Sequence, residues 1–294
     1  DVRLDLAPVV VSSHTHQVEA AQALLDHVGD HPSVGGNLGL DPLAAAARLG
    51  AEPDLTPLAD LVRATATRPG WRAITVDATV LHDAGATDVD ALAAAVATGV
   101  AYVRHLEAAG IAPAQAFDQV EFRVGATADQ FLTAAALRAL RRVWARVGEA
   151  SGVPEASRGA RTHAVTSLRM FTREDPWVNV LRSTLATFGA SIGGADAITV
   201  LPFDTVLGLP ERLGRRLARN TQILLADEAN VARVTDPGGG SWYLESLTDD
   251  VASAVWARFQ EVEASGGAVQ AFADGLFASW VADAVAQRDR DLAT

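Results

Sequence analysis

Residues 161–201 read RTHAVTSLRMFTREDPWVNVLRSTLATFGASIGGADAITVL, and this stretch decides the fold. It begins with a short β-type run at Arg161–Val165, continues as a helical stretch near residues 177–190, and ends in a second β-type run. Gly193-Gly194 separates the helix from the second run, because glycine readily takes the positive φ angle that follows a last helical turn. Two strands joined by a helix pair in parallel through a crossover.

The same alternation recurs along most of the chain. We expect β-type runs at Arg3–Leu6, Ser33–Leu38, Ala73–Asp77, Val120–Val124, Arg161–Val165 and Ala197–Leu201. We expect helical stretches near residues 15–28, 41–49, 88–109, 128–149, 177–190 and 211–227, with a loop-plus-helix excursion at Ala51–Thr67. Strands alternating with helices predict an α/β protein with a parallel sheet, either a barrel or a doubly wound sheet. Six strands are two short of a closed eight-stranded barrel, so a partner or a missing N-terminal part should cover the open edges.

The C-terminal part breaks the alternation. The cluster D-P-G-G-G at residues 236–240 predicts a tight turn or loop. Two amphipathic helices follow, at Leu247–Glu263 and Ala268–Arg290, with no β-type run between them. The sequence therefore divides into a barrel-like part, residues 1–240, and a C-terminal helical extension, residues 241–294.

Composition excludes several classes of enzyme. The 294 residues include no Cys, which excludes disulfides, thiolate nucleophiles and Cys-based metal sites. They include no Lys either, because all 24 basic residues are Arg. Schiff-base aldolases, pyridoxal-phosphate enzymes and Walker-type NTPases each need a Lys amine, so none of these classes fits unless a partner chain supplies it.

Charge and hydropathy favour a cytoplasmic protein that binds neither nucleic acid nor membranes. The net charge is −12, and the pairs Arg141–Arg142 and Arg215–Arg216 fall inside helical patterns, which predicts solvated helix faces. The start of the sequence, Asp1–Leu6, lacks the charged region and apolar core of a signal peptide. No uncharged apolar run approaches the roughly 20 residues of a membrane-spanning helix.

Histidines are the first candidates for chemistry. His82 begins an H-D-A-G string that is similar to half of a cobalamin-ligating D-x-H-x-x-G motif, but Val80 stands where that motif has its Asp. Without a carboxylate to orient the imidazole, we expect a buried, hydrogen-bonded loop histidine. Arg161 and His163 are two residues apart on one strand and share a face, either the barrel interior or the helix layer. An interior position would favour a ligand pocket, and both alternatives stay open.

Other groupings of reactive side chains are weaker evidence for a functional site. His14 and His16 flank Thr15 beside the first β-type run, and with no third ligand marked nearby we expect a solvated loop and no metal site. A Ser–His–Asp triad could be assembled from His163 with scattered Ser and Asp residues. No G-x-S-x-G elbow supports that arrangement, so the sequence permits it without indicating it.

A series of short strings between residues 70 and 260 is specific enough to suggest a family. The strings are Arg161-Thr162-His163, Thr166-Ser167, D-P-W-V-N-V at 175–180, G-G-A-D at 193–196, Phe203-Asp204, Leu209-Pro210, A-R-N-T-Q at 218–222, Asp236-Pro237 and G-G-S-W-Y at 239–243. In this order they resemble the methylmalonyl-CoA mutase family. The string D-A-G-A at residues 83–86 is similar to the family's E-A-G-A segment.

The resemblance implies a (β/α)₈ TIM-type barrel that holds an acyl-CoA along its axis. In catalytic chains a flavodoxin-like cobalamin domain follows the barrel. On this comparison the six β-type runs are barrel strands three to eight, and the first two strands and the cobalamin domain are absent from the sequence.

Departures from the catalytic members of the family fall at four strand ends. Thr79-Val80 stands where catalytic chains have a Tyr-His pair, and a Val cannot hydrogen-bond a thioester carbonyl. Gln119 and Glu121 stand near the catalytic Arg-x-Ser, Val165 replaces the Gln of R-T-H-x-Q-T-S, and L-P-F-D-T-V at 201–206 replaces N-A-F-D-E-A. The scaffold strings survive while the catalytic groups are lost, which is typical of the family's small, non-catalytic subunit.

The resemblance therefore implies a small-subunit-like protein that binds no cofactor itself. It would support a large catalytic subunit, which carries adenosylcobalamin and interconverts methylmalonyl-CoA and succinyl-CoA. The alternative is a stand-alone enzyme for another acyl-CoA or a small acid, with a repurposed barrel mouth. No residue receives a catalytic role on the first hypothesis. The candidate residues of a substrate pocket are Asp77, His82, Glu121, Arg161, His163, Phe203 and Asp204.

Overall fold

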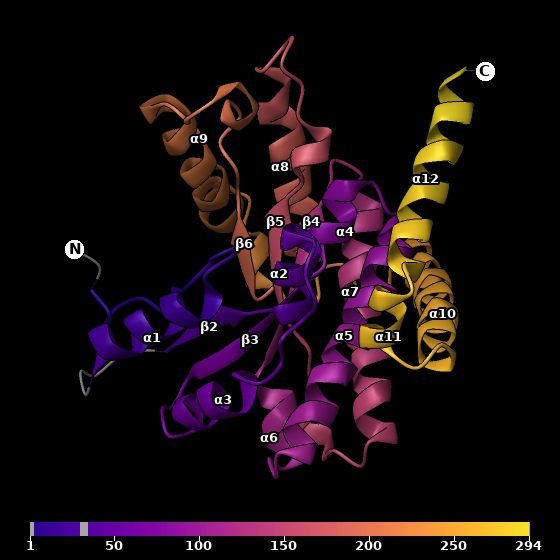
Figure 1. The fold of residues 1–294 in the computed structure, drawn as a ribbon. Coiled ribbons are helices and arrows are strands. Elements are labelled where there is room, and N and C mark those ends of the chain that lie inside the picture. Colours follow the sequence, from indigo (N-terminus) through magenta and orange to yellow (C-terminus); the bar gives the residue numbers. More distant parts are fainter. Residues whose placement is uncertain (1–2, 30–34, 294) are drawn as a thin grey trace.

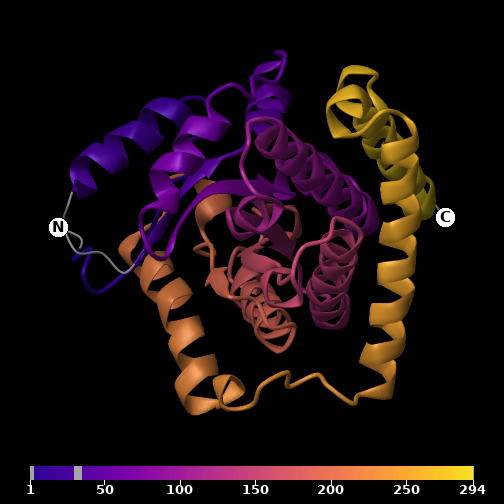
Figure 2. The same cartoon turned by 90° about the horizontal axis from the view of Figure 1, so that it is seen from below.

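A computed structural model describes residues 3–29 and 35–293, and within them six strands form one parallel sheet. The strands are β1 (Val9–Val10), β2 (Gly36–Leu40), β3 (Trp71–Asp77), β4 (Val120–Ala126), β5 (Arg161–Thr166) and β6 (Ala197–Thr199). Each pairs with the next along the chain, so the sheet order follows the sequence. A doubly wound sheet would reverse its order at a switch point, whereas a barrel does not. The sheet is a curled half-barrel (Figures 1 and 2).

Helices connect the strands and cover the outer face of the sheet (Figure 2). The helices between strands are α1 (Gln17–Val28), α2 (Pro42–Leu49), α3 (Leu58–Ala66), α4 (Thr79–Ala84), α5 (Asp88–Ala108), α6 (Pro113–Asp118), α7 (Gln130–Ala150) and α8 (Val178–Ile192). After the sheet come α9 (Arg212–Ile223), α10 (Trp242–Ala264), α11 (Ala268–Ala273) and α12 (Leu276–Ala293). This arrangement confirms the expected α/β class and the parallel pairing.

The first strand lies later than the sequence pattern predicts. The prediction of a strand at Arg3–Leu6 is wrong, because these residues form a turn in which the amides of Leu6 and Ala7 donate to the Arg3 carbonyl at 3.0 and 3.1 Å. An ion pair between Arg3 and Asp5 accompanies the turn. The strand instead occupies Val9–Val10, where β-branched side chains favour extended backbone, and it pairs with β2.

The other predicted elements are present with shifted ends, and the short helices α4 and α6 lie where the sequence pattern predicted none. The strand expected over Ser33–Leu38 runs from Gly36 to Leu40, and Ser33 itself lies outside the described residues. The helix expected over Ala268–Arg290 is interrupted between α11 and α12 at Gly275, whose φ of +76° is left-handed and ends the helical path.

The hydrophobic core lies between the sheet and the long helices α5 and α7. The Trp144 ring of α7 is fully buried, stacks on Phe117 with ring centroids 4.5 Å apart, and meets the edge of Phe122 from β4 at 4.9 Å. Gly99 of α5 allows this approach, because a Cβ at that position would come within 3.0 Å of the Trp144 ring. Because Phe122 points to the outer face of the sheet, its strand neighbours Glu121 and Arg123 face the barrel interior.

The C-terminal helices wrap this core. Helix α10 packs along both α5 and α7, and α11 and α12 follow on α5 and α4. Helix α5 is long and apolar enough to span a membrane, but 78% of its most apolar window is buried inside the protein. Its hydropathy therefore fits its position as a core helix of this fold.

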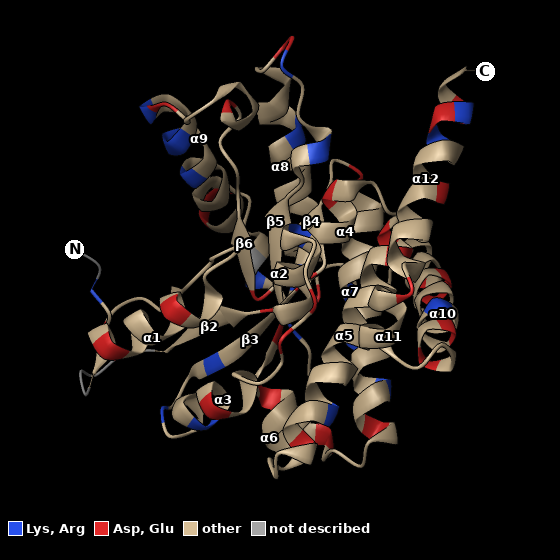
Figure 3. Ribbon diagram, in the orientation of Figure 1, with Lys and Arg blue, Asp and Glu red and all other residues tan. Residues whose placement is uncertain are grey.

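Charged residues are distributed unevenly over the helices (Figure 3). Arg215 and Arg216 are exposed on α9, as the helical pattern predicts. Arg142 is also exposed and pairs with Asp249 of α10. For Arg141 the prediction of a solvated face is wrong: its guanidinium donates to the carbonyls of Gly193 and Gly194 at 2.6 and 3.0 Å. Arg141 thus caps the carboxyl end of α8, where a cation is favourable to the helix dipole.

This cap predicts that substitutions at Arg141 and at its neighbour Arg142 lower the free energy of unfolding by different amounts. We expect Arg141→Met to lower the free energy of unfolding by about 1–3 kcal/mol, because half-buried carbonyls lose charge-assisted hydrogen bonds. The matched control Arg142→Met breaks an exposed ion pair and should cost less than about 1 kcal/mol. Urea denaturation of both variants measures the difference, and equal losses would show that Arg141 is not a cap.

Candidate functional site

A polar cavity of about 290 Å³ opens at the carboxyl ends of the strands. Its described lining residues are Val10, Val11, Ser12, Ser13, His14, Gln17, Gly39, Asp41, Arg48, Thr75, Asp77, Arg123, His163 and Thr199. This is the end at which barrels of parallel strands place their functional loops, so we call it the barrel mouth. Two of the seven predicted pocket residues, Asp77 and His163, line it.

Asp77, the last residue of β3, is the centre of the charge network in the barrel mouth. Its carboxylate is 2.7 Å from the guanidinium of Arg48 on α2 and 3.9 Å from that of Arg123 on β4. It also accepts hydrogen bonds from the Thr79 amide and hydroxyl. Burial alone would raise the pKa of Asp77, but Arg123, Thr79 and Arg48 together hold it below its usual value. Asp77 is therefore a paired anion and is poorly suited to act as a base.

His163, in the middle of β5, faces the barrel mouth across from Arg123. Its Nε2 lies 2.8 Å from the Thr199 hydroxyl, and its Nδ1 lies 3.9 Å from a Glu121 carboxylate oxygen. Burial lowers the pKa of His163 to about 4, and the nearby Arg123 cation acts in the same direction. The imidazole is neutral at physiological pH. Of the two positions left open by the sequence, the interior one is confirmed.

Glu121 and Arg161 lie deeper than His163, toward the amino ends of the strands. They pair across β4 and β5 and share the interior face, but neither lines the barrel mouth. Burial raises the pKa of Glu121, against the opposing effect of a hydrogen bond from Asn37. The Arg161 side chain is half exposed and lies 3.8 Å from Asp196. Neither residue is placed beside the Asp77 network.

Phe203 and Asp204 have packing roles outside the barrel mouth. The Phe203 ring stacks on Trp177 with centroids 4.7 Å apart and an interplanar angle of 22°. The buried Asp204 carboxylate accepts the Glu211 amide at 2.8 Å, at the amino end of α9, where an anion is favourable. A Cβ at Gly214 would come within 2.1 Å of this carboxylate, so α9 can approach it only with glycine there.

His82 belongs to a separate, buried arrangement that the sequence did not indicate. Its Nε2 lies 2.7 Å from the Ser167 hydroxyl at the end of β5, and its Nδ1 lies 3.2 Å from Asp88 at the start of α5. The order Ser–His–Asp matches a catalytic triad in geometry. However, His82 and Ser167 are each only 3% exposed, and the adjoining cavity measures about 10 Å³. No substrate can reach this serine, so the three residues join α4 to β5 inside the protein. The expectation of a buried, hydrogen-bonded histidine is confirmed, but its placement in a loop is wrong, because His82 lies in α4.

Gln119 lies at the end of the barrel opposite the barrel mouth. It is one of the positions where the resemblance implies a lost catalytic group. It stands just before β4, and its side-chain oxygen accepts the Thr65 hydroxyl at 2.7 Å and the Ala73 amide at 3.0 Å. It is therefore a buried structural link between α3 and the sheet.

Sequence reasoning missed Arg48, Arg123 and Asp41 in the barrel mouth. Asp41 is fully buried, and its carboxylate accepts the Tyr102 hydroxyl at 2.5 Å and the Asp77 amide at 2.6 Å. Burial raises the pKa of Asp41 to about 6. A signal for Arg123 was present, since it follows Glu121 by two residues and so shares its face. Arg48 comes from a helix and had no such signal.

The fold and this cavity define a class, namely part of a parallel α/β barrel with a polar pocket at the carboxyl ends of its strands. The family model for methylmalonyl-CoA mutase matches residues 45–294, so the chain belongs to the methylmalonyl-CoA mutase family. This finding confirms the resemblance seen in the sequence strings.

Among similar proteins, some are named as small subunits of the mutase and others as the mutase itself. The methylmalonyl-CoA mutase small subunit of Propionibacterium freudenreichii subsp. shermanii is 55% identical over 273 residues, covering 91% of this chain and 43% of that protein. The small subunit of Streptomyces virginiae is 50% identical over 299 residues, covering 99% of this chain and 48% of that protein. The methylmalonyl-CoA mutase of Escherichia coli is 33% identical over 227 residues, covering 76% and 32%. The chain thus spans about half the length of the curated small subunits it matches.

Two of the groups with a shifted pKa in the barrel mouth, His163 and Asp41, predict opposite effects of pH on stability. His163 titrates near 4 when folded and near 6.5 when unfolded, so its contribution is present above pH 6.5 and is lost as pH falls toward 4. Asp41 titrates near 6 when folded and near 3.8 when unfolded, so stability falls as pH rises between those values.

We expect His163→Gln to remove the first effect and leave the second. Between pH 4 and 6.5 the free energy of unfolding of wild type, relative to the variant, should rise by about 3 kcal/mol. Urea denaturation at several pH values measures this, with the exposed His27→Gln variant as control. Parallel pH profiles for wild type and His163→Gln would show that His163 is not held neutral by the fold.

Proposed function

We propose that this chain forms part of a small, non-catalytic subunit that assembles with a larger subunit of an adenosylcobalamin-dependent mutase. The larger subunit would interconvert methylmalonyl-CoA and succinyl-CoA. The observation that carries the proposal is the identity of 44–55% over 91–99% of this chain to proteins named small subunits of methylmalonyl-CoA mutase. We further propose a cytoplasmic location, since the one described helix that is long and apolar enough to span a membrane is mostly buried inside the protein.

The proposal includes a complete (β/α)₈ barrel. In the described residues β1 and β6 are the two edges of the sheet, and the order between them is continuous. Two further parallel strands placed between β6 and β1 would close the ring and pair both edges. Residues 1–240 would then belong to the barrel, and residues 241–294 to a helical extension that packs on its outer face.

The geometry of the barrel mouth supports a non-catalytic role. The carboxylate of Asp77 is shared between two guanidinium groups and a threonine. His163 is neutral and bonded to Thr199. The position that the resemblance assigns to a catalytic Tyr-His pair holds Thr79, which donates to Asp77, and Val80, which lines a different, apolar cavity. Polar groups that bond to one another in this way are not arranged around an incoming substrate.

His82, the candidate that the sequence offers for a cobalamin ligand, does not fit that role. The histidine whose string is similar to a cobalamin-ligating motif is His82, and both of its ring nitrogens are used inside the protein, by Ser167 and Asp88. Reaching a cobalt ion would require breaking both contacts and exposing a side chain that is 3% exposed. The adenosylcobalamin of the assembly would therefore belong to the larger subunit.

Ligand titration and assembly together test the proposal. We expect calorimetry to show no saturable binding of adenosylcobalamin or methylmalonyl-CoA by the purified chain. The chain mixed with a catalytic subunit should elute with it in gel filtration, since assembly is the proposed role. The Escherichia coli mutase serves as the reference for ligand binding. Tight cobalamin binding, or turnover of methylmalonyl-CoA by the chain alone, would contradict the non-catalytic assignment and favour the stand-alone enzyme.

A further inference from the structure

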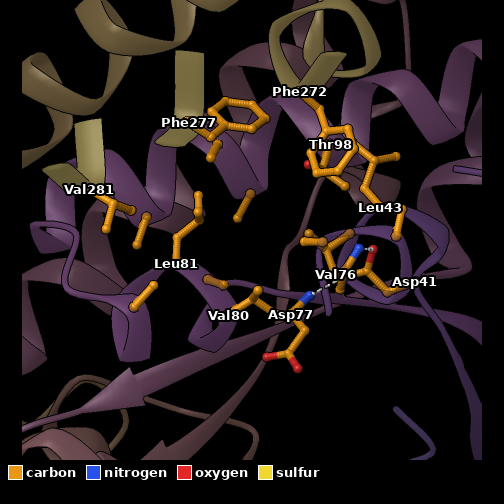
Figure 4. Close-up of a pocket in the computed structure, with 18 of the residues that line it drawn as sticks. Asp41, Leu43, Val76, Asp77, Val80, Leu81, Thr98, Phe272, Phe277 and Val281 are labelled. Atoms are coloured by element: carbon orange, nitrogen blue, oxygen red, sulfur yellow. Dashed lines mark hydrogen bonds between the residues drawn. The ribbon is translucent and has the colours of Figure 1, made fainter. Parts of the chain in front are cut away.

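A second cavity, larger than the barrel mouth, lies behind the sheet between α2, α4, α5 and the C-terminal helices. It measures about 380 Å³, within the range of small-molecule pockets. Figure 4 shows Phe272, Phe277 and Val281 of α11 and α12 on one side, and Val80 and Leu81 of α4 on the other. The C-terminal helices therefore form one wall of the pocket.

Small side chains leave this space open. Helix α5 turns one face toward the cavity, with Ala91, Ala94, Ala95 and Thr98 at the spacing that places residues on one side of a helix. The other alanines of the lining are Ala44, Ala46, Ala47, Ala78, Ala84 and Ala278. Of these, Ala47, Ala84 and Ala278 are exposed at the rim, so the cavity has an entrance from solvent.

Thr98 supplies a polar group with no partner. Its residue is only 7% exposed, and its hydroxyl makes no hydrogen bond within the described residues. Threonine hydroxyls inside helices usually bond back to the carbonyl four residues earlier. Five others in this chain do so, namely Thr65, Thr184, Thr187, Thr221 and Thr248. This hydroxyl is not shut off from solvent, so water can pair with it, and a ligand that displaces this water loses affinity unless it offers a hydrogen-bonding group in return.

The charges around the cavity select the kind of ligand. No described lining residue is basic, so an anion would be buried without a partner. Asp41, whose carboxylate bonds to Tyr102 and the Asp77 amide, adds an acidic group at one end. The carboxylate of Asp77 points away from the cavity toward the barrel mouth (Figure 4). A neutral molecule fits these constraints and a fatty acid anion does not.

We propose that this cavity binds a neutral, mainly hydrocarbon molecule with one hydrogen-bonding group, and that the Thr98 hydroxyl pairs with that group. Asp41 and Asp77 line both this cavity and the barrel mouth. A ligand bound here therefore touches the wall that separates the two sites. The proposal does not depend on the chain's role in a mutase.

Calorimetric titration of the purified chain with 1-octanol, and separately with octanoate, tests the proposal. We expect saturable 1:1 binding of 1-octanol and at least tenfold weaker binding of octanoate. Thr98→Val keeps the side-chain shape and removes the hydroxyl, so it should weaken 1-octanol binding roughly fivefold, the usual effect of one neutral hydrogen bond. Thr221→Val, a helical threonine outside the cavity, should leave binding unchanged.

A second variant separates loss of the site from loss of the fold. Ala94→Leu places a larger side chain in the cavity and should abolish 1-octanol binding without lowering the unfolding temperature. Three results would each overturn the proposal: no saturable binding of 1-octanol by the folded chain, equal binding of octanoate, or equal effects of Thr98→Val and Thr221→Val. Loss of 1-octanol binding when the chain is joined to the other half of a relative's small subunit would also overturn it, because a protein segment would then fill the cavity.

Discussion

The buried carboxylate of Asp41 is the interaction on which the arrangement of this half-barrel depends. It accepts the Ala44 amide at the start of α2, the Tyr102 hydroxyl of α5 and the Asp77 amide at the end of β3. One side chain thus fixes a connecting helix, a core helix and a strand relative to one another. Complete burial makes the charge of this carboxylate expensive, and the three donors offset only part of that cost, so its pKa stays raised. Asp41 is also part of the wall of the barrel mouth and of the larger apolar cavity behind the sheet.

The hydrogen bond from the Asp77 amide to the Asp41 carboxylate fixes the position of Asp77. The arrangement of charges in the barrel mouth depends in turn on the Asp77 carboxylate. This carboxylate lies between Arg48 and Arg123, so the two cations are directed at a residue of the protein itself. A catalytic barrel of this kind would direct such groups at a substrate. The same fold therefore carries a site in which attraction within the protein replaces attraction to a ligand. This arrangement supports the proposed non-catalytic role of the chain.

The sequence predicted the parallel sheet, the helix order and the family, because periodicity and short ordered strings are local properties. It placed the first strand wrongly, since the alternation of Arg3–Leu6 competes with a turn held by the Arg3 carbonyl. It found Asp77 and His163, which end or occupy strands, but it grouped them with Phe203 and Asp204, whose contacts are with Trp177 and α9. Arg48 and the pairing of His82 with Ser167 could not be predicted, because both join segments separated by 29 and 85 residues. Which side chains meet at such separations is decided by packing, not by local pattern.

The central claim is that β1 and β6 are the two edges of one barrel that two further strands close. Amide hydrogen exchange across Val9–Val10 and Ala197–Thr199 tests it most directly. In the chain alone these amides should exchange much faster than those of β3 to β5. When the chain is joined to the remaining half of a relative's small subunit, both edges should become protected together, since one of the two added strands would pair with β1 and the other with β6. Protection of one edge alone, or of neither, would contradict barrel closure.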